Sequence, residues 1–336
     1  MLAFLYGCDQ EKGPLALGEV SKTSVSSEEG NSECKAPKKL AYIVSDNRIP
    51  YWKIMENGIL DEARKRGYEV KVYSAHNDKK RELEWIAKAF QENVEGIILS
   101  PTDSSACATV LKLAHGEHIP VVVSDIGSES RDYVAYVSSD NERGGYEVGR
   151  ALAVDLRRHG WQNGMVGIVS IPQKRGNGQK RTQGFLRALE ENGIRNIRIV
   201  QQRTFTYEET YRYTLDLIES FPQLRAIWLQ GSNQYQAALD AIAKSKKKGK
   251  IILAVFDAEP SFIQLIPKGV ISVSGMQQPY RMGLEAMKLM DEHLHGRTVP
   301  KEVVLPVLTV TRENIQKYCK IIDSDVLGKC ERKERP

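Results

Sequence analysis

The chain has 336 residues, which is too long for one ordinary hydrophobic core and predicts two lobes of about 150 residues each. Hydrophobic residues make up 41% and charged residues 27%, values that exclude a disordered or fibrous protein. The net charge of +5 is modest, and the densest basic run, residues 244–250, has no interleaved aromatic residues. We therefore expect a solvated helix end there rather than a nucleic-acid surface.

The amino terminus resembles the lipobox of bacterial lipoproteins, in which a cysteine carries the lipid. Leu5, Tyr6 and Gly7 precede Cys8, but too few residues stand before this cysteine for a complete signal peptide. We interpret residues 1–8 as the remnant of a lipoprotein signal peptide whose start lies upstream; the alternative is a chance match. Residues 9–37 are rich in Gly, Ser and Glu, which predicts a flexible linker.

From Lys39 onward, apolar strand patterns alternate with helices of about a dozen residues. In the first half the strands are expected at 40–44, 69–73, 96–99 and 121–123, and the helices at 51–65, 79–91 and 105–115. A glycine-bearing segment, 140–149, then opens another helix. In the second half the strands are expected at 165–170, 197–202, 226–229, 251–256, 270–276 and 303–310, and the helices at 179–192, 208–220, 233–243 and 281–294. This alternation predicts an α/β fold with two doubly wound parallel-sheet lobes.

Polar or aromatic residues recur where the predicted strands end. The clearest cases are residues 45–52, 100–104, 124–127, 230–233 and 256–259. In open parallel sheets, ligands bind outside the carboxyl ends of the strands. The loops therefore predict one cleft that binds a small molecule.

The sequence contains no motif of the common enzyme classes. Residues 176–178 lack the third glycine of a dinucleotide fingerprint, and neither a phosphate-binding loop nor a Gly-x-Ser-x-Gly elbow occurs. Residues 9–36 lack the apolar periodicity of a DNA-binding helix-turn-helix. The histidines have no metal-ligand spacing and read as solvated surface residues, among them His76, His115, His118 and His159. We expect neither catalysis nor a metal nor a cofactor.

Residues 38–312 resemble the ribose-type periplasmic sugar-binding proteins, which are type I periplasmic binding proteins. The matching landmarks, in order, are Pro50-Tyr51-Trp52, Ser100-Pro101-Thr102-Asp103, Ser124-Asp125, Ser139-Asp140-Asn141, Arg181-Thr182-Gln183-Gly184-Phe185, Phe256-Asp257 and Gln277 before Pro279. The resemblance implies lobes that hinge on crossing strands near Ser139–Asp140, Met276–Gln278 and Pro306. It implies an N-terminal lobe of residues 38–139 plus 278–306, a C-terminal lobe of 140–277 plus 307–318, and a polar tail of 319–336.

The resemblance also implies which residues contact a ligand. Tyr51 and Trp52 would stack on a sugar ring, although Trp52 could equally face the core. Asp125 and Asp257 would clamp hydroxyl groups from opposite lobes, with helix capping as the alternative. Gln277 would add a donor and an acceptor at a crossing strand, with a hinge hydrogen bond as the alternative.

Several positions depart from the ribose-binding pattern. Ile49 and Ile126 replace polar residues of that pattern, and Gly231 replaces an asparagine, which leaves Asn233 to offer polar groups. We place Gln179 where the family has an arginine near the start of the second lobe's first helix. The loss of guanidinium donors predicts a more apolar pocket and makes ribose a doubtful ligand.

The family further implies location and partners. We expect a monomer in the periplasm or at the extracytoplasmic face, lipid-anchored through Cys8, that delivers a sugar-like ligand to the permease of an ABC importer. The alternative is a sensory subunit that docks on a sensor histidine kinase or chemoreceptor. Cys319 and Cys330 could form a disulfide in an oxidising compartment, whereas Cys107 lies on an apolar helical face and reads as a buried thiol.

Overall fold

The fold was obtained as a computed structural model, which describes residues 38–172 and 174–329. Cys8, the linker and Cys330 lie outside the described residues. Within the described residues, no helix is long and apolar enough to cross a membrane.

The N-terminal lobe contains a six-stranded sheet with the order β11-β5-β4-β3-β1-β2, and all its strand pairs are parallel. Its strands are β1 (Lys38–Val44), β2 (Tyr68–Ser74), β3 (Gly96–Ser100), β4 (Val121–Ser124), β5 (Ala135–Ser139) and β11 (Glu302–Leu305). Its helices are α1 (Pro50–Lys65), α2 (Lys79–Gln91), α3 (Ser104–Gly116) and α9 (Pro279–Leu294).

The C-terminal lobe repeats this plan with the order β12-β10-β9-β8-β6-β7. Its strands are β6 (Met165–Ser170), β7 (Ile197–Gln201), β8 (Leu224–Leu229), β9 (Ile252–Phe256), β10 (Val273–Met276) and β12 (Leu308–Thr311), of which β12 runs antiparallel to β10. Its helices are α4 (Asn141–Arg158), α5 (Gly176–Glu191), α6 (Tyr207–Ser220), α7 (Tyr235–Lys244), α8 (Phe262–Leu265) and α10 (Ile315–Ile321), followed by a π-helical turn, η1 (Ile322–Val326). The α/β fold class predicted from the sequence is therefore confirmed.

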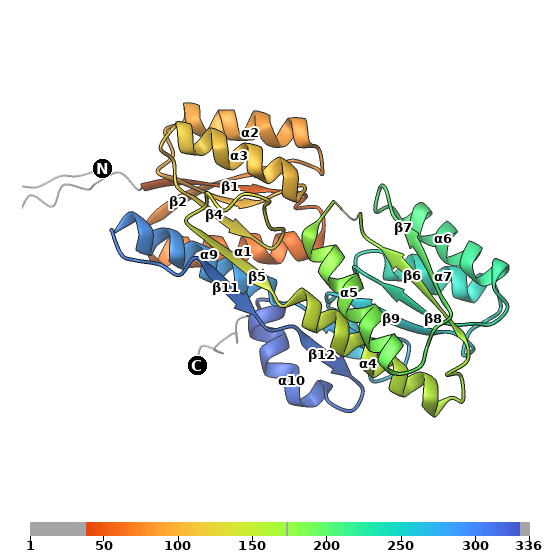
Figure 1. The fold of residues 1–336 in the computed structure, drawn as a ribbon. Coiled ribbons are helices and arrows are strands. Elements are labelled where there is room, and N and C mark those ends of the chain that lie inside the picture. Colours follow the sequence, from red (N-terminus) through yellow and green to blue (C-terminus); the bar gives the residue numbers. More distant parts are fainter. Residues whose placement is uncertain (1–37, 173, 330–336) are drawn as a thin grey trace, which may run out of the picture. The chain divides into compact units, whose positions relative to one another are not determined.

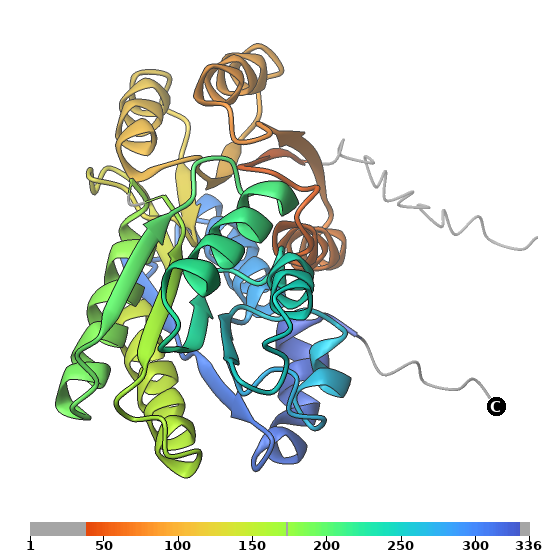
Figure 2. The same cartoon turned by 90° about the vertical axis from the view of Figure 1, so that its right-hand side faces the viewer.

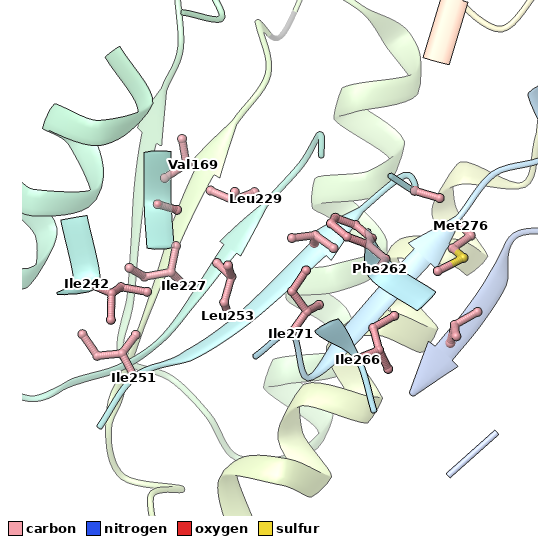
Figure 3. Close-up of a cluster of buried hydrophobic side chains, with 14 of the residues drawn as sticks. Val169, Ile227, Leu229, Ile242, Ile251, Leu253, Phe262, Ile266, Ile271 and Met276 are labelled. Carbon is pink, nitrogen blue, oxygen red and sulfur yellow. The ribbon is translucent and has the colours of Figure 1, made fainter. Parts of the chain in front are cut away.

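Each sheet is covered by helices on both faces, as alternating side chains of buried parallel strands require. In the N-terminal lobe, Tyr42 of β1 belongs to a buried cluster with α1 and α9, while the adjacent Ile43 belongs to one with α2 and α3. Figure 1 shows these two pairs of helices on opposite sides of β1. In the C-terminal lobe, α4 and α5 lie together on one face (Figures 1 and 2). On the other face, Ile227, Leu253 and Phe262 of α8 belong to one cluster of buried apolar side chains (Figure 3).

The segments that cross between the lobes are hydrogen-bonded to one another. The backbone N–H of Asp140, between β5 and α4, donates to the carbonyl of Leu305 at 2.9 Å. The side chain of Gln278, between β10 and α9, donates to the carbonyl of Pro306 at 2.8 Å. These contacts join the crossing segments in one hinge.

The carboxyl-terminal segment differs from the polar tail that the sequence predicts. Ile322 and Val326 of η1 are each only 1% exposed, because they pack on the apolar face of the C-terminal lobe. Residues 315–327 therefore belong to the folded lobe. In this segment Cys319 is exposed, whereas Cys107 is buried in the N-terminal lobe as expected. The proposed bond to Cys330 is untested.

Candidate ligand-binding cleft

Asp125 and Asp257 occupy equivalent turns in the two lobes. Each follows a buried strand, and each has a positive φ, 60° at Asp125 and 71° at Asp257, which is uncommon for a residue with a side chain. Each backbone N–H donates to the next strand, that of Asp125 to the Val137 carbonyl at 2.9 Å and that of Asp257 to the Gly275 carbonyl at 2.8 Å. Backbone strain held by such bonds tends to cluster at functional sites.

Neither aspartate caps a helix. The element after Asp125 is the strand β5, and the helix after Asp257, α8, has Ser261 at its N-cap. The capping alternative is therefore excluded for both residues, and neither carboxylate is used to bind a helix N-terminus.

The carboxylate of Asp125 already has partners from both lobes. The Tyr51 hydroxyl donates to Oδ1 at 2.7 Å, and Asn177 Nδ2, at the start of α5, donates to Oδ2 at 3.1 Å. Burial raises the pKa of Asp125, while Arg181, through its positive charge, and the hydrogen bond from Tyr51 act against this rise. Because Asn177 belongs to the C-terminal lobe, its hydrogen bond joins the two lobes directly at Asp125.

Tyr51 and Trp52 begin α1 directly after Pro50, a residue that suits the first turn of a helix. Their rings meet edge to face, with centroids 5.0 Å apart. Trp52 is 4% exposed and belongs to the core of the N-terminal lobe, whereas the Tyr51 hydroxyl reaches Asp125. Burial and the nearby charges of Asp125 and Asp257 raise the pKa of Tyr51, so its hydroxyl remains a donor.

The carboxylate of Asp257 keeps one oxygen more open. Gln277 Nε2 donates to Oδ1 at 2.5 Å, while Oδ2 lies 3.8 Å from Arg181 Nη1. Burial raises the pKa of Asp257 as well, against the lowering effects of Arg181 and Gln277. Gln277 Oε1 is buried and has no hydrogen-bond partner among the described residues. Gln277 Oε1 is thus an acceptor that still lacks a donor, next to the amide group that binds Asp257.

Arg181 is a buried cation of this cleft, and the sequence analysis named it only as the first residue of a family landmark. Its Nε donates to Asn141 Oδ1 at 2.7 Å, its Nη1 donates to the Gln230 carbonyl at 3.0 Å, and its guanidinium lies 4.1 Å from the ring centroid of Phe256. Gln179 itself is exposed, because it lies on a different face of α5. The structure does not bring Gln179 together with the aspartates.

Close packing of α4 on α5 places Arg181. A Cβ at Gly145 would lie 2.3 Å from the Arg181 carbonyl oxygen, and one at Gly184 would clash with the backbone of Glu142. Glycine at both positions lets the helices approach and turns Arg181 inward. The Arg-Thr-Gln-Gly-Phe landmark contained this signal, since the arginine stands three residues before the contact glycine.

The loop after β8 adds polar side chains to the wall formed by the C-terminal lobe. Asn233 is half-buried there, beside Ser232, whose hydroxyl donates to Glu259 Oε1 at 2.7 Å. Burial raises the pKa of Glu259 to about 7, and the negative charge of Asp257 adds to the effect. The wall of the C-terminal lobe is consequently rich in hydrogen-bond acceptors.

The arrangement suits recognition of a molecule with several hydroxyl groups. Carboxylates, an amide and an arginine converge next to an aromatic pair, and such groups fix polar ligands in a concave site. The described residues contain no cluster of side chains that could hold a metal ion. A groove of about 1210 Å³ lies elsewhere, between α4 and β12, and shares none of these side chains.

The fold and the cleft define a two-lobed binding protein, and comparison with known proteins identifies the family. The model of the periplasmic binding protein domain matches residues 40–298. The chain therefore belongs to the periplasmic binding protein family. The resemblance seen in the sequence is confirmed, and members of this family that resemble the chain are binding proteins rather than enzymes.

Two of the similar proteins are named as binding proteins for a sugar. The ribose import binding protein of Bacillus subtilis (strain 168) is 27% identical over 286 residues, which cover 84% of this chain and 90% of that protein. The D-allose-binding periplasmic protein of Escherichia coli (strain K12) is 21% identical over 275 residues, covering 79% and 88% respectively.

A solved structure shows the same fold. The solute-binding protein of a carbohydrate transporter from Agrobacterium radiobacter, in complex with D-arabinose, superposes with a TM-score of 0.80 at 22% identity, covering 87% of this chain and 99% of that one. The shared architecture extends over both lobes.

Proposed function

We propose that the protein captures a sugar or sugar-like molecule between its lobes, outside the cytoplasm, and delivers it to the permease of an ABC importer. The similarity to ribose and allose binding proteins supports the ligand class. The alternative of a sensory subunit has no support in these comparisons. Monomeric capture and release is the simplest form of this function.

One observation carries the proposal: Gln277 Oε1 is a buried acceptor without a hydrogen-bond partner among the described residues, and it belongs to the side chain that donates to Asp257, whose Oδ2 lies 3.8 Å from Arg181. Hydroxyl groups are donors that satisfy such acceptors, and a carboxylate binds them more strongly than a neutral group does. Tyr51, which Trp52 contacts edge to face from the core, would contact the ligand from the opposite lobe, and Asn233 would supply further polar groups.

A thermal-shift screen tests this function. D-Ribose, D-allose, D-arabinose and myo-inositol are added separately to the full chain, and the melting temperature is compared with that of Asp257→Ala. A ligand present at 100 times its dissociation constant adds about 2.7 kcal/mol to the unfolding free energy. At least one sugar should stabilise the wild type and fail to stabilise the variant. Equal shifts in both proteins would place the sugar outside this cleft.

We also propose that Cys8 anchors the protein by a lipid. The support is Leu5-Tyr6-Gly7-Cys8 ahead of a long polar segment. A gene that includes the upstream sequence should give protein that fractionates with membranes, and Cys8→Ser should release it or leave it unprocessed. Identical fractionation of the two proteins would contradict the anchor.

A further inference from the structure

We propose that Arg175 is an interlobe latch: a positioning residue that holds the two lobes together over the ligand without contacting the ligand itself. The inference rests on the proposed function, because it concerns closure of the same cleft. Arg175 is the N-cap residue of α5, in the C-terminal lobe, and its side chain reaches the N-terminal lobe.

The guanidinium group of Arg175 binds three separate loops of the opposite lobe. Its Nε donates to the Thr102 carbonyl at 3.1 Å, and its Nη2 donates to Ser45 Oγ at 3.1 Å and to Asn77 Oδ1 at 3.0 Å. These acceptors follow β3, β1 and β2 respectively. One side chain thus fastens three neighbouring strand ends, for which the planar fork of arginine is suited.

The same guanidinium is also held on its own lobe. Its central carbon lies 5.2 Å from the ring centroid of Phe205, in the loop between β7 and α6. An aromatic face attracts a guanidinium cation and limits its rotamers, so the side chain is directed across the cleft. Phe205 has a φ of 58°, an uncommon backbone conformation for a bulky residue.

Neighbouring backbone groups strengthen the junction. The N–H of Gly176 donates to Ser104 Oγ at 3.2 Å, and the N–H of Ser104 donates to the Lys174 carbonyl at 3.4 Å. Segments 100–104 and 174–177 are therefore hydrogen-bonded to each other next to Arg175. Their amide hydrogens report directly on whether this junction is open or closed.

The charge of Arg175 suits this place. The negative charges of Asp125, Asp103 and Glu82 act to raise the pKa of Arg175, against burial and the positive charge of Arg181. Burial lowers the pKa of Arg175 to about 10, which still leaves the group charged at neutral pH. Its hydrogen-bond acceptors are neutral, so it occupies no oxygen of Asp125 or Asp257. The atoms that Arg175 binds are therefore different from the carboxylate oxygens proposed to bind the sugar.

Hydrogen–deuterium exchange of the full chain without sugar tests the latch. Arg175→Ala should speed exchange about tenfold or more at the amides of Ser104 and Gly176, because bonds from a charged donor are among the stronger ones. Exchange in the strands of both lobe cores should not change. Lys180→Ala, an exposed position on the same helix, is the matched control. Exchange at Ser104 and Gly176 that is equal in Arg175→Ala and Lys180→Ala would overturn the proposal.

Two further variants separate a latch from a folding defect. Arg175→Lys keeps the charge but loses the fork, so its exchange should lie between those of wild type and alanine variant. Ser45→Ala removes one acceptor on the opposite lobe and should also speed exchange at Ser104 and Gly176. If Arg175→Ala speeds exchange throughout both lobe cores, that variant is partly unfolded, and the test rests on Arg175→Lys and Ser45→Ala instead. Exchange at Ser104 and Gly176 as slow as in the wild type in both of these variants would overturn the latch.

A sugar measurement distinguishes failure of the latch from failure of the proposed function. D-Arabinose and D-allose are used as probes, and their dissociation rates are measured by stopped flow. Arg175→Ala should release a bound sugar about tenfold faster with little change in association, since the closed form is less stable. Unchanged release would count against the latch. If neither of these sugars, nor any compound in the thermal-shift screen, binds the wild type, the proposed function fails. The exchange experiment, which uses no sugar, still tests whether Arg175 holds the lobes together.

Discussion

Asp125 and Asp257 stand in the same kind of turn, one in each lobe, but their carboxylates have different surroundings. Both oxygens of Asp125 accept hydrogen bonds from the protein, one from Tyr51 and one from Asn177 of the opposite lobe. Asp257 accepts one such bond and leaves Oδ2 at 3.8 Å from Arg181, and its side chain is 14% exposed. A repeated fold has therefore produced one carboxylate that joins the lobes and one that remains open.

This difference indicates a division of labour between the two walls of the cleft. In the N-terminal wall, polar groups mainly hold the loops and the junction with the other lobe. In the C-terminal wall, we propose that Asp257 and Gln277 accept hydrogen bonds from sugar hydroxyl groups. Substitutions in the first wall should mainly change stability or closure, and substitutions in the second should mainly change affinity.

The largest expected effect is on stability and comes from Glu82, a buried carboxylate behind the N-terminal wall. Its Oε2 accepts from the Thr102 N–H at 2.6 Å, and burial raises its pKa to about 7. An acid with a raised pKa in the folded state lowers stability as the pH rises from about 4.5 to about 7. Glu82→Gln should therefore raise the unfolding free energy by about 3 kcal/mol at pH 8, at 1.36 kcal/mol per pKa unit.

The same variant should gain much less at pH 5, about 1 kcal/mol, because Glu82 is then mostly protonated in the folded wild type. Denaturant titrations at the two pH values measure the difference. Glu84→Gln, an exposed neighbour on α2, is the control and should show no such dependence. Sugar affinity should be unaffected by Glu82→Gln. A large loss of affinity in Glu82→Gln would contradict the assignment of stability to the N-terminal wall and affinity to the C-terminal wall.

The next largest effect is on affinity and comes from Asp257→Asn. Loss of the negative charge should weaken sugar binding by about 1.5–3 kcal/mol, the usual contribution of hydrogen bonds to charged groups. The melting temperature without sugar should not fall, since burial raises the pKa of Asp257 and the variant removes a charge that burial disfavours. Isothermal titration with the sugar that gives the largest thermal shift measures the loss. Asp216→Asn, exposed on α6, is the control.

Asp125→Asn should have a smaller effect on affinity, about 1.5 kcal/mol, and a different cause. The amide nitrogen cannot accept a hydrogen bond, so either Tyr51 or Asn177 loses its acceptor. The loss should appear mainly as faster dissociation of the sugar and faster amide exchange near Asn177. An affinity loss greater than that of Asp257→Asn would reverse the assignment of the two carboxylates.

Tyr51→Phe should have the smallest effect, about 0.5–1.5 kcal/mol, because it removes one hydroxyl and keeps the aromatic ring. The hydrogen bond from Tyr51 lowers the pKa of Asp125, so its loss should raise that pKa further. The pH dependence of sugar binding should shift upward accordingly. A pH profile identical to that of the wild type would show that the Tyr51 hydroxyl does not act on Asp125.

The sequence was sufficient to predict the architecture, because each strand is a short apolar run and each helix has its own apolar spacing. Helix α4, for example, was expected from a glycine-bearing segment that begins at Asp140, and the structure places its N-cap there. The carboxyl-terminal turn η1 was missed because Ile322 and Val326 are two apolar residues in a polar context, and only contact with the other elements shows that they are buried.

The site was predicted less completely, for a physical reason. Residues at strand ends, such as Asp125 and Asp257, are placed by the sheet itself, so sequence position sufficed. Arg181 and Gln179 lie on one helix, and only packing of α5 on α4 decides which of them turns inward. Arg175 had no predicted role, because its acceptors belong to loops far away in the sequence.

A crystal structure of the protein with the sugar that gives the largest thermal shift tests the central claim most directly. We predict that the sugar lies between the lobes, that one of its hydroxyl groups donates to Asp257 Oδ2 and another to Gln277 Oε1, and that Arg175 still binds the N-terminal lobe without touching the sugar. A sugar bound outside the cleft, or one that contacts Asp125 in place of Tyr51 and Asn177 while leaving Asp257 free, would contradict the account.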